Sequence, residues 1–160
     1  MKLNLVFGDS DLERVNLLQR GFESHPQLTA CVLKPDELRA LPSLHAFYLS
    51  ITAAERWGSF VPRPTVHEAR VLRTTAKDRA DGWPPFVIAG IALRDGEEHF
   101  DAKFGLRLII KAVIKAVRKF NEADDLIQSI GFESGWTGID RLPPLEASQI
   151  ICAAYDEGIT

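Results

Sequence analysis

Short apolar stretches alternate with amphipathic segments along this chain of 160 residues. The apolar stretches predict strands at 3–7, 28–33, 44–51, 66–75, 86–93 and 127–132. The segments between them predict helices at 10–22, 35–38, 99–120 and 144–155. Because strands that alternate with helices pack as layers, the pattern predicts an α/β fold with a mixed, largely parallel sheet.

The carboxyl ends of such strands are where α/β proteins bind ligands. The loops after Ile51, Leu93 and Phe132 are therefore expected to gather at one rim of the sheet. The stretch 52–65 is predicted to be irregular, and 77–85 to be a charged turn. An irregular connection as long as 52–65 often carries function in a compact domain.

Charge and cysteine usage remove several function classes. The net charge of −3 gives no general attraction to nucleic acid or to a membrane surface. Cys31 and Cys152 lie in apolar contexts and lack metal-ligand spacing, which is typical of reduced core residues in a cytoplasmic protein. No apolar run approaches the ~20 residues that span a bilayer. Neither a membrane nor a nucleic acid is expected as a partner.

Histidine spacing predicts no metal centre. The four histidines are scattered, and no two of them have the spacing of metal ligands. They are His25, His45, His67 and His99. We therefore expect neither a metal nor a resident cofactor.

The segment 129–147 reads as an apolar strand, a glycine-bearing loop and the start of a helix. Gly135 and Gly138 allow a tight turn and a close approach of the backbone to a ligand. A helix that follows such a loop can direct its free N–H groups at an anion. The loop lacks the Gly-Lys-Ser/Thr of a Walker sequence and the glycine spacing of a dinucleotide fingerprint, so by itself it also fits a simple strand-to-helix turn.

The same segment resembles the macrodomain family of ADP-ribose-binding modules. The similarity lies in the strand 127–132, the turn Thr137-Gly138-Ile139, and the run Pro143-Pro144-Leu145-Glu146-Ala147. In order of elements it extends over 28–157. The resemblance implies a three-layer α/β/α sandwich that forms a single macrodomain-like domain over 1–160.

The resemblance also implies a ligand and its contacts. Thr137, Gly138 and Ile139 would hold the diphosphate of ADP-ribose, and Asp36 would contact the adenine. Gly138-Ile139-Asp140-Arg141-Leu142 resembles the Gly-Leu-Asp-Arg-Leu run of macrodomain hydrolases, which makes Asp140 the catalytic candidate. The implied partners are an ADP-ribose-like small molecule or an ADP-ribosylated macromolecule.

The first ligand loop of the family corresponds to 50–58 and is replaced by bulkier residues. Its binding candidates are Thr52, Ala53, Trp57 and Gly58, and those of the last loop also include Gly135 and Trp136. Two hypotheses follow. One is binding of ADP-ribose or a related nucleotide, with hydrolysis through Asp140. The alternative is a degenerate macrodomain that has lost the nucleotide and acts through a protein partner.

Two further patterns leave alternatives open. Trp57 and Trp136 are expected on adjacent loops, where they would share a pocket or pack as loop staples. Basic residues recur on the predicted helix 99–120 at Lys103, Arg107, Lys111, Lys115, Arg118 and Lys119. This stripe fits a phosphate-contact surface or the solvated face of an amphipathic helix, and the net negative charge favours the second.

Overall fold

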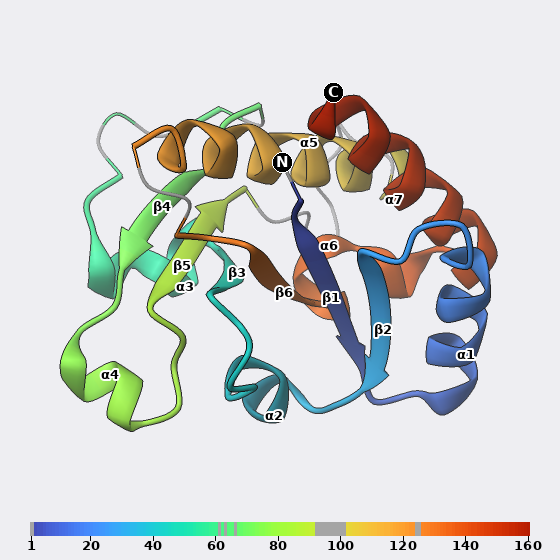
Figure 1. Ribbon diagram of the computed structural model, residues 1–160, viewed down its shortest axis with the longest axis horizontal. Coiled ribbons are helices and arrows are strands. Elements are labelled where there is room, and N and C mark those ends of the chain that lie inside the picture. Colours follow the sequence, from blue (N-terminus) through green and yellow to red (C-terminus); the bar gives the residue numbers. More distant parts are fainter. Residues whose placement is uncertain (1, 61, 63, 66, 92–101, 124–125) are drawn as a thin grey trace.

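The computed structural model is described here for residues 2–60, 62, 64–65, 67–91, 102–123 and 126–160. Its six strands form one sheet in the order β2-β1-β6-β3-β5-β4. Their bounds are β1 Asn4–Asp9, β2 Leu28–Val32, β3 Ala46–Ser50, β4 Arg70–Arg73, β5 Phe86–Gly90 and β6 Ser129–Glu133. All neighbouring strands pair in parallel except β4, which runs antiparallel to β5 at one edge (Figure 1). The predicted mixed, largely parallel sheet is confirmed.

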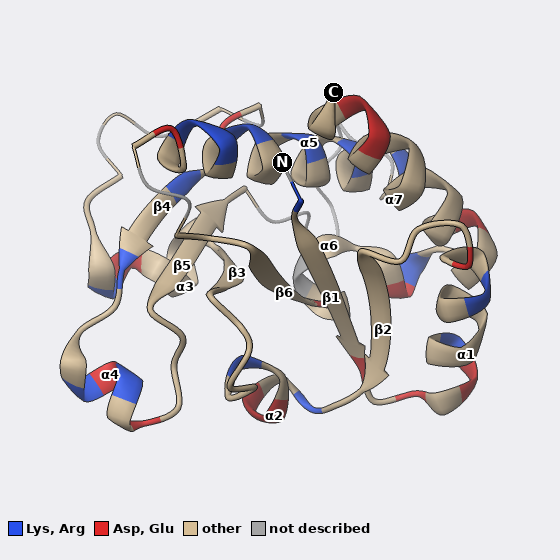
Figure 2. Ribbon diagram, viewed as in Figure 1, with Lys and Arg blue, Asp and Glu red and all other residues tan. Residues whose placement is uncertain are grey.

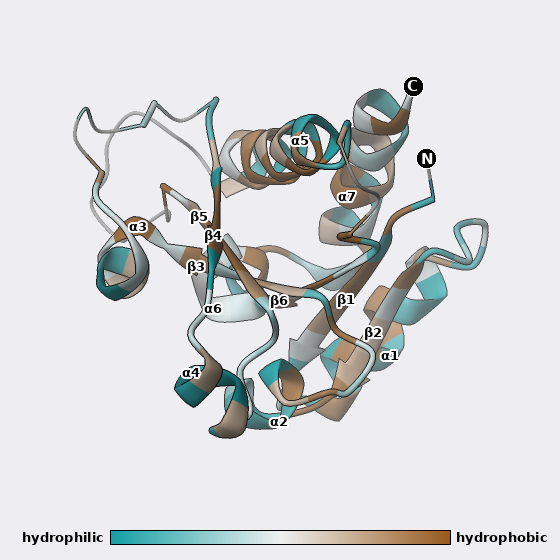
Figure 3. Ribbon diagram, turned by 60° about the vertical axis from the view of Figure 1, so that its left-hand side comes forward, coloured by the Kyte–Doolittle hydropathy of each residue, from teal (hydrophilic) through white to brown (hydrophobic). Residues whose placement is uncertain are grey.

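Helices cover both faces of the sheet, so the α/β/α sandwich is also confirmed. The α-helices are α1 Leu12–Gly21, α2 Pro35–Arg39, α3 Ile51–Ala54, α4 Ala76–Ala80, α5 Ala102–Phe120, α6 Ser134–Thr137 and α7 Pro144–Ile159. Two 3-10 turns are η1 Glu55–Trp57 and η2 Ile139–Arg141. Figure 3 shows α5 and α7 above the sheet, with α2 and α4 below it.

Alternation along the strands sends side chains to two separate cores. On β3, Tyr48 belongs to the core under α1, α5 and α7, whereas Phe47 and Leu49 belong to the opposite core. That opposite core also contains Leu38 of α2 and Ala54 of α3. Each strand of the sheet centre is therefore buried on both faces, which explains why these strands are almost continuously apolar.

The start of α1 differs in detail from the prediction. The helix begins at Leu12 rather than at residue 10, because Asp11 caps it: its carboxylate accepts from the N–H groups of Glu13 (3.0 Å) and Arg14 (3.2 Å). Those two amides are among the first-turn donors that have no partner within the helix. The prediction of a helix from this point to about residue 22 is confirmed.

Two regions predicted to be irregular contain short helices. Residues 52–65 begin with the end of α3 and with η1, and 77–85 begin inside α4. Ser50 caps α3 through its hydroxyl, and Thr75 and Asp78 form a capping box at α4. Helices of one turn are too short to show a helical period, so only the caps could have indicated them. The predicted start of the long helix, 99–101, lies outside the described residues.

The strands at the two edges of the sheet are tied to neighbouring segments by side-chain hydrogen bonds. At β2 the backbone N–H of Ala30 donates to Oε1 of Gln19 on α1, at 3.0 Å. At β4, Arg70 donates to the carbonyl oxygens of Ser59 (3.0 Å) and Pro62 (2.6 Å). Both edge strands thus form polar contacts with segments outside the sheet.

The connections that follow the parallel neighbours β6 and β3 leave toward opposite faces of the sheet. After β6 the chain enters α6, which contacts α5, whereas after β3 it enters α3 on the opposite face. Adjacent strands whose continuations leave to opposite faces create the crevice in which open α/β sheets hold ligands. Ser50 and Glu133, at the ends of β3 and β6, mark this position.

Candidate ligand site on the β3 face

A cavity of about 360 Å³ runs along β3 on the face covered by α2 and α3. Its floor is Phe47 and Leu49, and Glu133 lines it at the carboxyl end of β6. The remaining lining residues are Pro35, Arg39, Ala53, Arg56, Trp57 and Trp83. Four separate segments of the chain therefore meet around one space.

Two indoles pack against each other at this cavity. The rings of Trp57 and Trp83 are 4.8 Å apart and tilted by 64°. Trp83 also packs edge-on against Phe47, with centroids 6.3 Å apart. Edge-to-face packing of this kind holds aromatic rings in defined positions. The indoles thus form a fixed apolar wall beside the β3 floor.

Two guanidinium groups lie over these indoles. The Cζ atom of Arg39 is 4.3 Å from the ring centroid of Trp83. The Cζ atom of Arg56 is 4.0 Å from the centroid of Trp57 and 5.1 Å from that of Trp83. A guanidinium within ~6 Å of a ring face is attracted by the ring quadrupole. The cavity therefore combines aromatic faces with positive charge.

Asp78 of α4 fixes this arrangement. Its carboxylate accepts from Nε1 of Trp57 at 2.7 Å and from Nη2 of Arg56 at 2.8 Å. The same carboxylate accepts from the backbone N–H (3.0 Å) and the hydroxyl (2.8 Å) of Thr75. Donation by Trp57, followed by Thr75 and then the charge of Arg56, lowers the pKa of Asp78 to about 2. One carboxylate thus orients both an indole and an arginine.

The chemistry of the cavity suits a planar, anionic ligand. Aromatic faces receive a flat ring system, and guanidinium groups recognise phosphate or carboxylate oxygens. Arg56 is already neutralised in part by Asp78, so Arg39 is the cation better placed to meet a ligand anion. Glu133 can accept hydrogen bonds from ligand hydroxyl or amino groups.

Only part of the predicted first-loop set lies at this cavity. Ala53 and Trp57 line it, and Asp36 is exposed in α2 beside the lining residue Pro35. Thr52 is exposed on α3. At Gly58, a β-carbon would lie 2.8 Å from Cδ2 of Leu72, so this residue packs closely against β4. The side chain of Trp136 lies outside the described residues, and Trp57 has Trp83 as its aromatic neighbour.

The predicted diphosphate turn lies on the opposite side of the sheet. It is not an open loop, because α6 begins directly after β6 and ends at Thr137, and Gly138 follows it with a positive φ of 78°. The hydroxyl of Thr137 is buried and donates to the carbonyl oxygens of Glu133 (3.3 Å) and Ser134 (3.2 Å). Ile139 is buried in the core under α5 and α7. Gly135 is exposed on α6.

A buried carboxylate that sequence reasoning missed ties this turn to the end of β1. Asp9 is 8% exposed and accepts from Oγ of Ser134 (2.7 Å), from the N–H of Asp11 (2.9 Å) and from Nη1 of Arg14 (2.9 Å). Burial by itself raises the pKa of Asp9, but these three hydrogen bonds outweigh it, so the pKa is lowered. The sequence feature that could have indicated this site is a single Asp at the end of an apolar strand.

Asp140, the predicted catalytic residue, is exposed in η2 near this cluster. The pKa of Arg14 is raised, first by the hydrogen bond to Asp9 and to a smaller extent by the charges of Asp11 and Asp140. Among the described residues that line the β3-face cavity, none comes from α6 or η2. The structure therefore does not bring Asp140 and Trp57 together around one space.

Two kinds of feature are absent from the part of the chain that the structure describes. It contains no group of three or more His, Cys, Asp or Glu residues able to hold a metal ion. No described helix has both the length and the apolar character required to cross a bilayer.

Comparison with known proteins gives no identity for the chain. No protein-family model matches it. No curated protein matches its sequence. The function is therefore inferred from the geometry of the site.

Proposed function

We propose that the β3-face cavity binds a nucleotide, with ADP-ribose as the first ligand to test. The observation that carries this proposal is the stacking of Arg39 and Arg56 on Trp83 and Trp57 within one cavity. A base has a flat face for the indoles, and a phosphate has the charge and oxygens for Arg39. Glu133 at the far end suits ribose hydroxyls better than phosphates, because two anions repel.

The size of the cavity limits which part of a ligand is enclosed. About 360 Å³ is near the lower end of the ~300–1,000 Å³ range of ligand pockets. A mononucleotide, or one half of ADP-ribose, matches this volume best. ADP-ribose is tested as well because 127–147 resembles the diphosphate turn of macrodomains, although no described lining residue of the cavity comes from α6 or η2.

Calorimetric titration with AMP and with ADP-ribose tests the proposal. Arg39→Gln removes the stacked cation and is expected to weaken binding by roughly tenfold or more, which corresponds to ~1.4 kcal/mol. Arg20→Gln, which removes an exposed cation from α1, is the matched control and should bind as the original protein does. Absence of heat with both ligands at high concentration overturns the proposal.

A second pair of variants separates the cavity from the diphosphate turn. If Gly138→Glu abolishes binding while Arg39→Gln leaves it unchanged, the ligand lies at the turn and the β3-face cavity is excluded. The reverse pattern supports the cavity. Circular dichroism of each variant confirms that the fold is retained before its affinity is compared.

Hydrolysis through Asp140 remains a separate prediction. Asp140 is exposed next to the charge of Arg14, but it does not line the cavity. If the resemblance to macrodomain hydrolases extends to activity, release of ADP-ribose from a modified substrate disappears in Asp140→Ala. Binding in the cavity does not depend on this outcome.

A further inference from the structure

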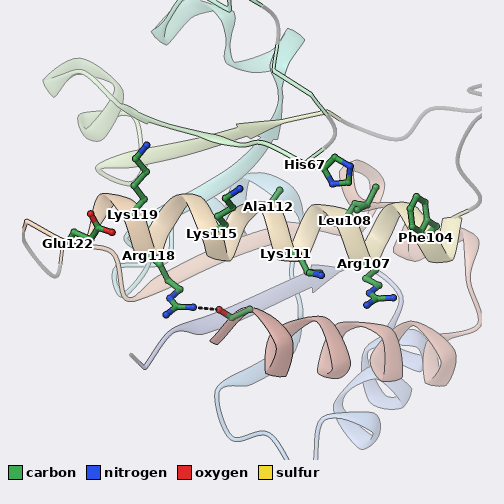
Figure 4. Close-up of a pocket in the computed structure, with 11 residues that line it drawn as sticks. His67, Phe104, Arg107, Leu108, Lys111, Ala112, Lys115, Arg118, Lys119 and Glu122 are labelled. Atoms are coloured by element: carbon green, nitrogen blue, oxygen red, sulfur yellow. Dashed lines mark hydrogen bonds between the residues drawn. The ribbon is translucent and has the colours of Figure 1, made fainter. Parts of the chain in front are cut away.

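A second and larger cavity, of about 790 Å³, follows the outer surface of α5. Figure 4 shows His67 on the side of this groove away from α7. Gly158, near the end of α7, also lines the groove. The α5 residues that line it are Phe104, Arg107, Leu108, Lys111, Ala112, Lys115, Arg118 and Lys119, with Glu122 just beyond the helix. We call this surface the α5 groove. It lies on the opposite side of the sheet from the β3-face cavity.

The α5 groove is apolar at one end and basic at the other. Phe104 is 47% exposed, and Leu108 is partly exposed one helical turn further along. Lys115 and Lys119 are exposed near the other end of α5, where Figure 4 shows both side chains on the side away from α7. Figure 2 shows the concentration of basic residues along this helix. A partner must therefore supply an apolar contact and, further along, negative charge.

Some cations of the stripe are already matched by α7. Arg107 and Lys111 both pair with Glu157, at 2.9 Å and 3.1 Å. Arg118 donates to the carbonyl oxygen of Gly158 at 2.8 Å. Among the described residues, neither Lys115 nor Lys119 forms an ion pair. These two lysines supply the positive charge that a partner can neutralise.

Neighbouring acids offset only part of this charge. The pKa of Glu68 is lowered, chiefly by hydrogen bonds from Thr65 and to a smaller extent by the charges of Arg70 and Lys115. Glu122 is the one acidic residue among the described lining residues of the groove. The basic end thus keeps an excess of positive charge on a chain whose net charge is −3.

We propose that the α5 groove binds an acidic amphipathic helix of a protein partner. An apolar side chain of that helix packs on Phe104 and Leu108, and its carboxylates pair with Lys115 and Lys119. Leu108 and Lys115 are seven positions apart, or ~10 Å along the helix axis. A partner helix that lies along α5 presents matching residues at i and i+7, on one face.

Nucleic acid fits the groove less well. A phosphate backbone needs continuous positive charge, whereas one end of this groove is apolar. Of the basic residues on α5, Arg107 and Arg118 are already bonded to α7. The negative net charge of the chain also opposes a polyanion at long range. An amphipathic helix needs positive charge only at Lys115 and Lys119, and with a few carboxylates it is repelled far less than a polyanion.

Fluorescence anisotropy with a labelled synthetic helix of about four turns tests this inference. The peptide carries leucine and glutamate seven positions apart, and a scrambled peptide of the same composition is the control. We expect the designed peptide to bind the original protein, and the scrambled peptide to bind it roughly tenfold more weakly or worse. The double variant Lys115→Glu with Lys119→Glu should lower the affinity for the designed peptide by a similar factor.

Matched variants distinguish a specific groove from general charge. Lys77→Glu on α4 and Leu12→Ser on α1 change exposed residues elsewhere and should leave the affinity unchanged, whereas Phe104→Ser should reduce it. Equal affinity for the scrambled peptide overturns the inference, and so does an unchanged affinity in the double lysine variant. Tighter binding of a single-stranded oligonucleotide, with a steep salt dependence, assigns the groove to nucleic acid instead.

Discussion

The indole N–H of Trp57 donates to Oδ2 of Asp78 at 2.7 Å, so an exposed turn and a short helix are joined at the edge of the candidate site. Asp78 has a pKa of about 2 rather than its ordinary 3.8, first because of Trp57 and then because of Thr75 and Arg56. A lowered pKa means that the folded state favours the carboxylate. The Asp78 carboxylate therefore contributes its full stabilisation above pH 3.8, and this stabilisation is lost as the pH falls toward 2.

Thermal unfolding of Asp78→Asn checks this expectation. The difference in Tm between the original protein and the variant should be constant at neutral pH and should shrink as the pH falls between 3.8 and about 2. Tryptophan fluorescence reports the change, because Trp57 loses a charged acceptor. A difference that stays constant over that interval would contradict the assignment.

Removal of one donor from the Asp9 carboxylate is expected to destabilise the fold. Ser134→Ala leaves a buried charged group without its 2.7 Å partner, which costs ~1–3 kcal/mol. Urea unfolding measures the loss. Ser10→Ala changes an exposed serine next to the same strand end and should be neutral. Equal stability of the two variants would show that Ser134 is not an essential donor to Asp9.

The close approach of Tyr48 to Gly90 leaves no room for a larger residue at the end of β5. A β-carbon at Gly90 would lie 2.8 Å from the Tyr48 hydroxyl oxygen, and Tyr48 is fully buried against Phe132. Gly90→Ala is therefore expected to cost ~1–3 kcal/mol by overpacking. Calorimetric melting of the variant measures this cost.

Tyr48→Phe is expected to restore part of the stability that Gly90→Ala loses. Burial raises the pKa of Tyr48, and within the described part of the chain its hydroxyl has no hydrogen-bond partner. Removal of that hydroxyl should be neutral or stabilising, and it should recover part of the loss in Gly90→Ala. Additive losses in the double variant would rule out this contact as the cause.

Two glycines of the last turn should respond in opposite directions to alanine. Gly138 has a φ of 78°, so Gly138→Ala is expected to cost ~1–2 kcal/mol. Gly135 lies inside α6 and is exposed, so Gly135→Ala should gain up to ~1 kcal/mol of helix propensity. Paired urea denaturation curves test the contrast. The same sign in both variants would contradict it.

Strand positions were predictable because burial on both faces leaves an almost unbroken apolar run, as in β3 and β5. The contact between Trp57 and Trp83 was not predictable from the sequence. It depends on η1 and the segment after α4 meeting over the same face of the sheet. The residue pattern within one segment does not indicate which distant segments it will contact.

The last turn shows the same limit at short range. Apolar residues and glycines in 129–139 indicated a strand followed by a turn, and β6 and Gly138 occupy those positions. The pattern did not indicate that α6 would replace an open loop, because a helix of four residues has no visible period. The buried Asp9 was also hidden, since its partners come from α1 and α6.

The side chains at the two edges of the sheet have a consequence for how copies of the protein behave together. An unprotected edge strand can recruit a strand from another molecule and begin aggregation. Here Gln19 occupies an amide of β2, and β4 is only four residues long and carries Arg70 and Arg73. Both edges of the sheet thus disfavour the addition of a seventh strand. Folded molecules in a concentrated solution are therefore protected from association through backbone hydrogen bonds.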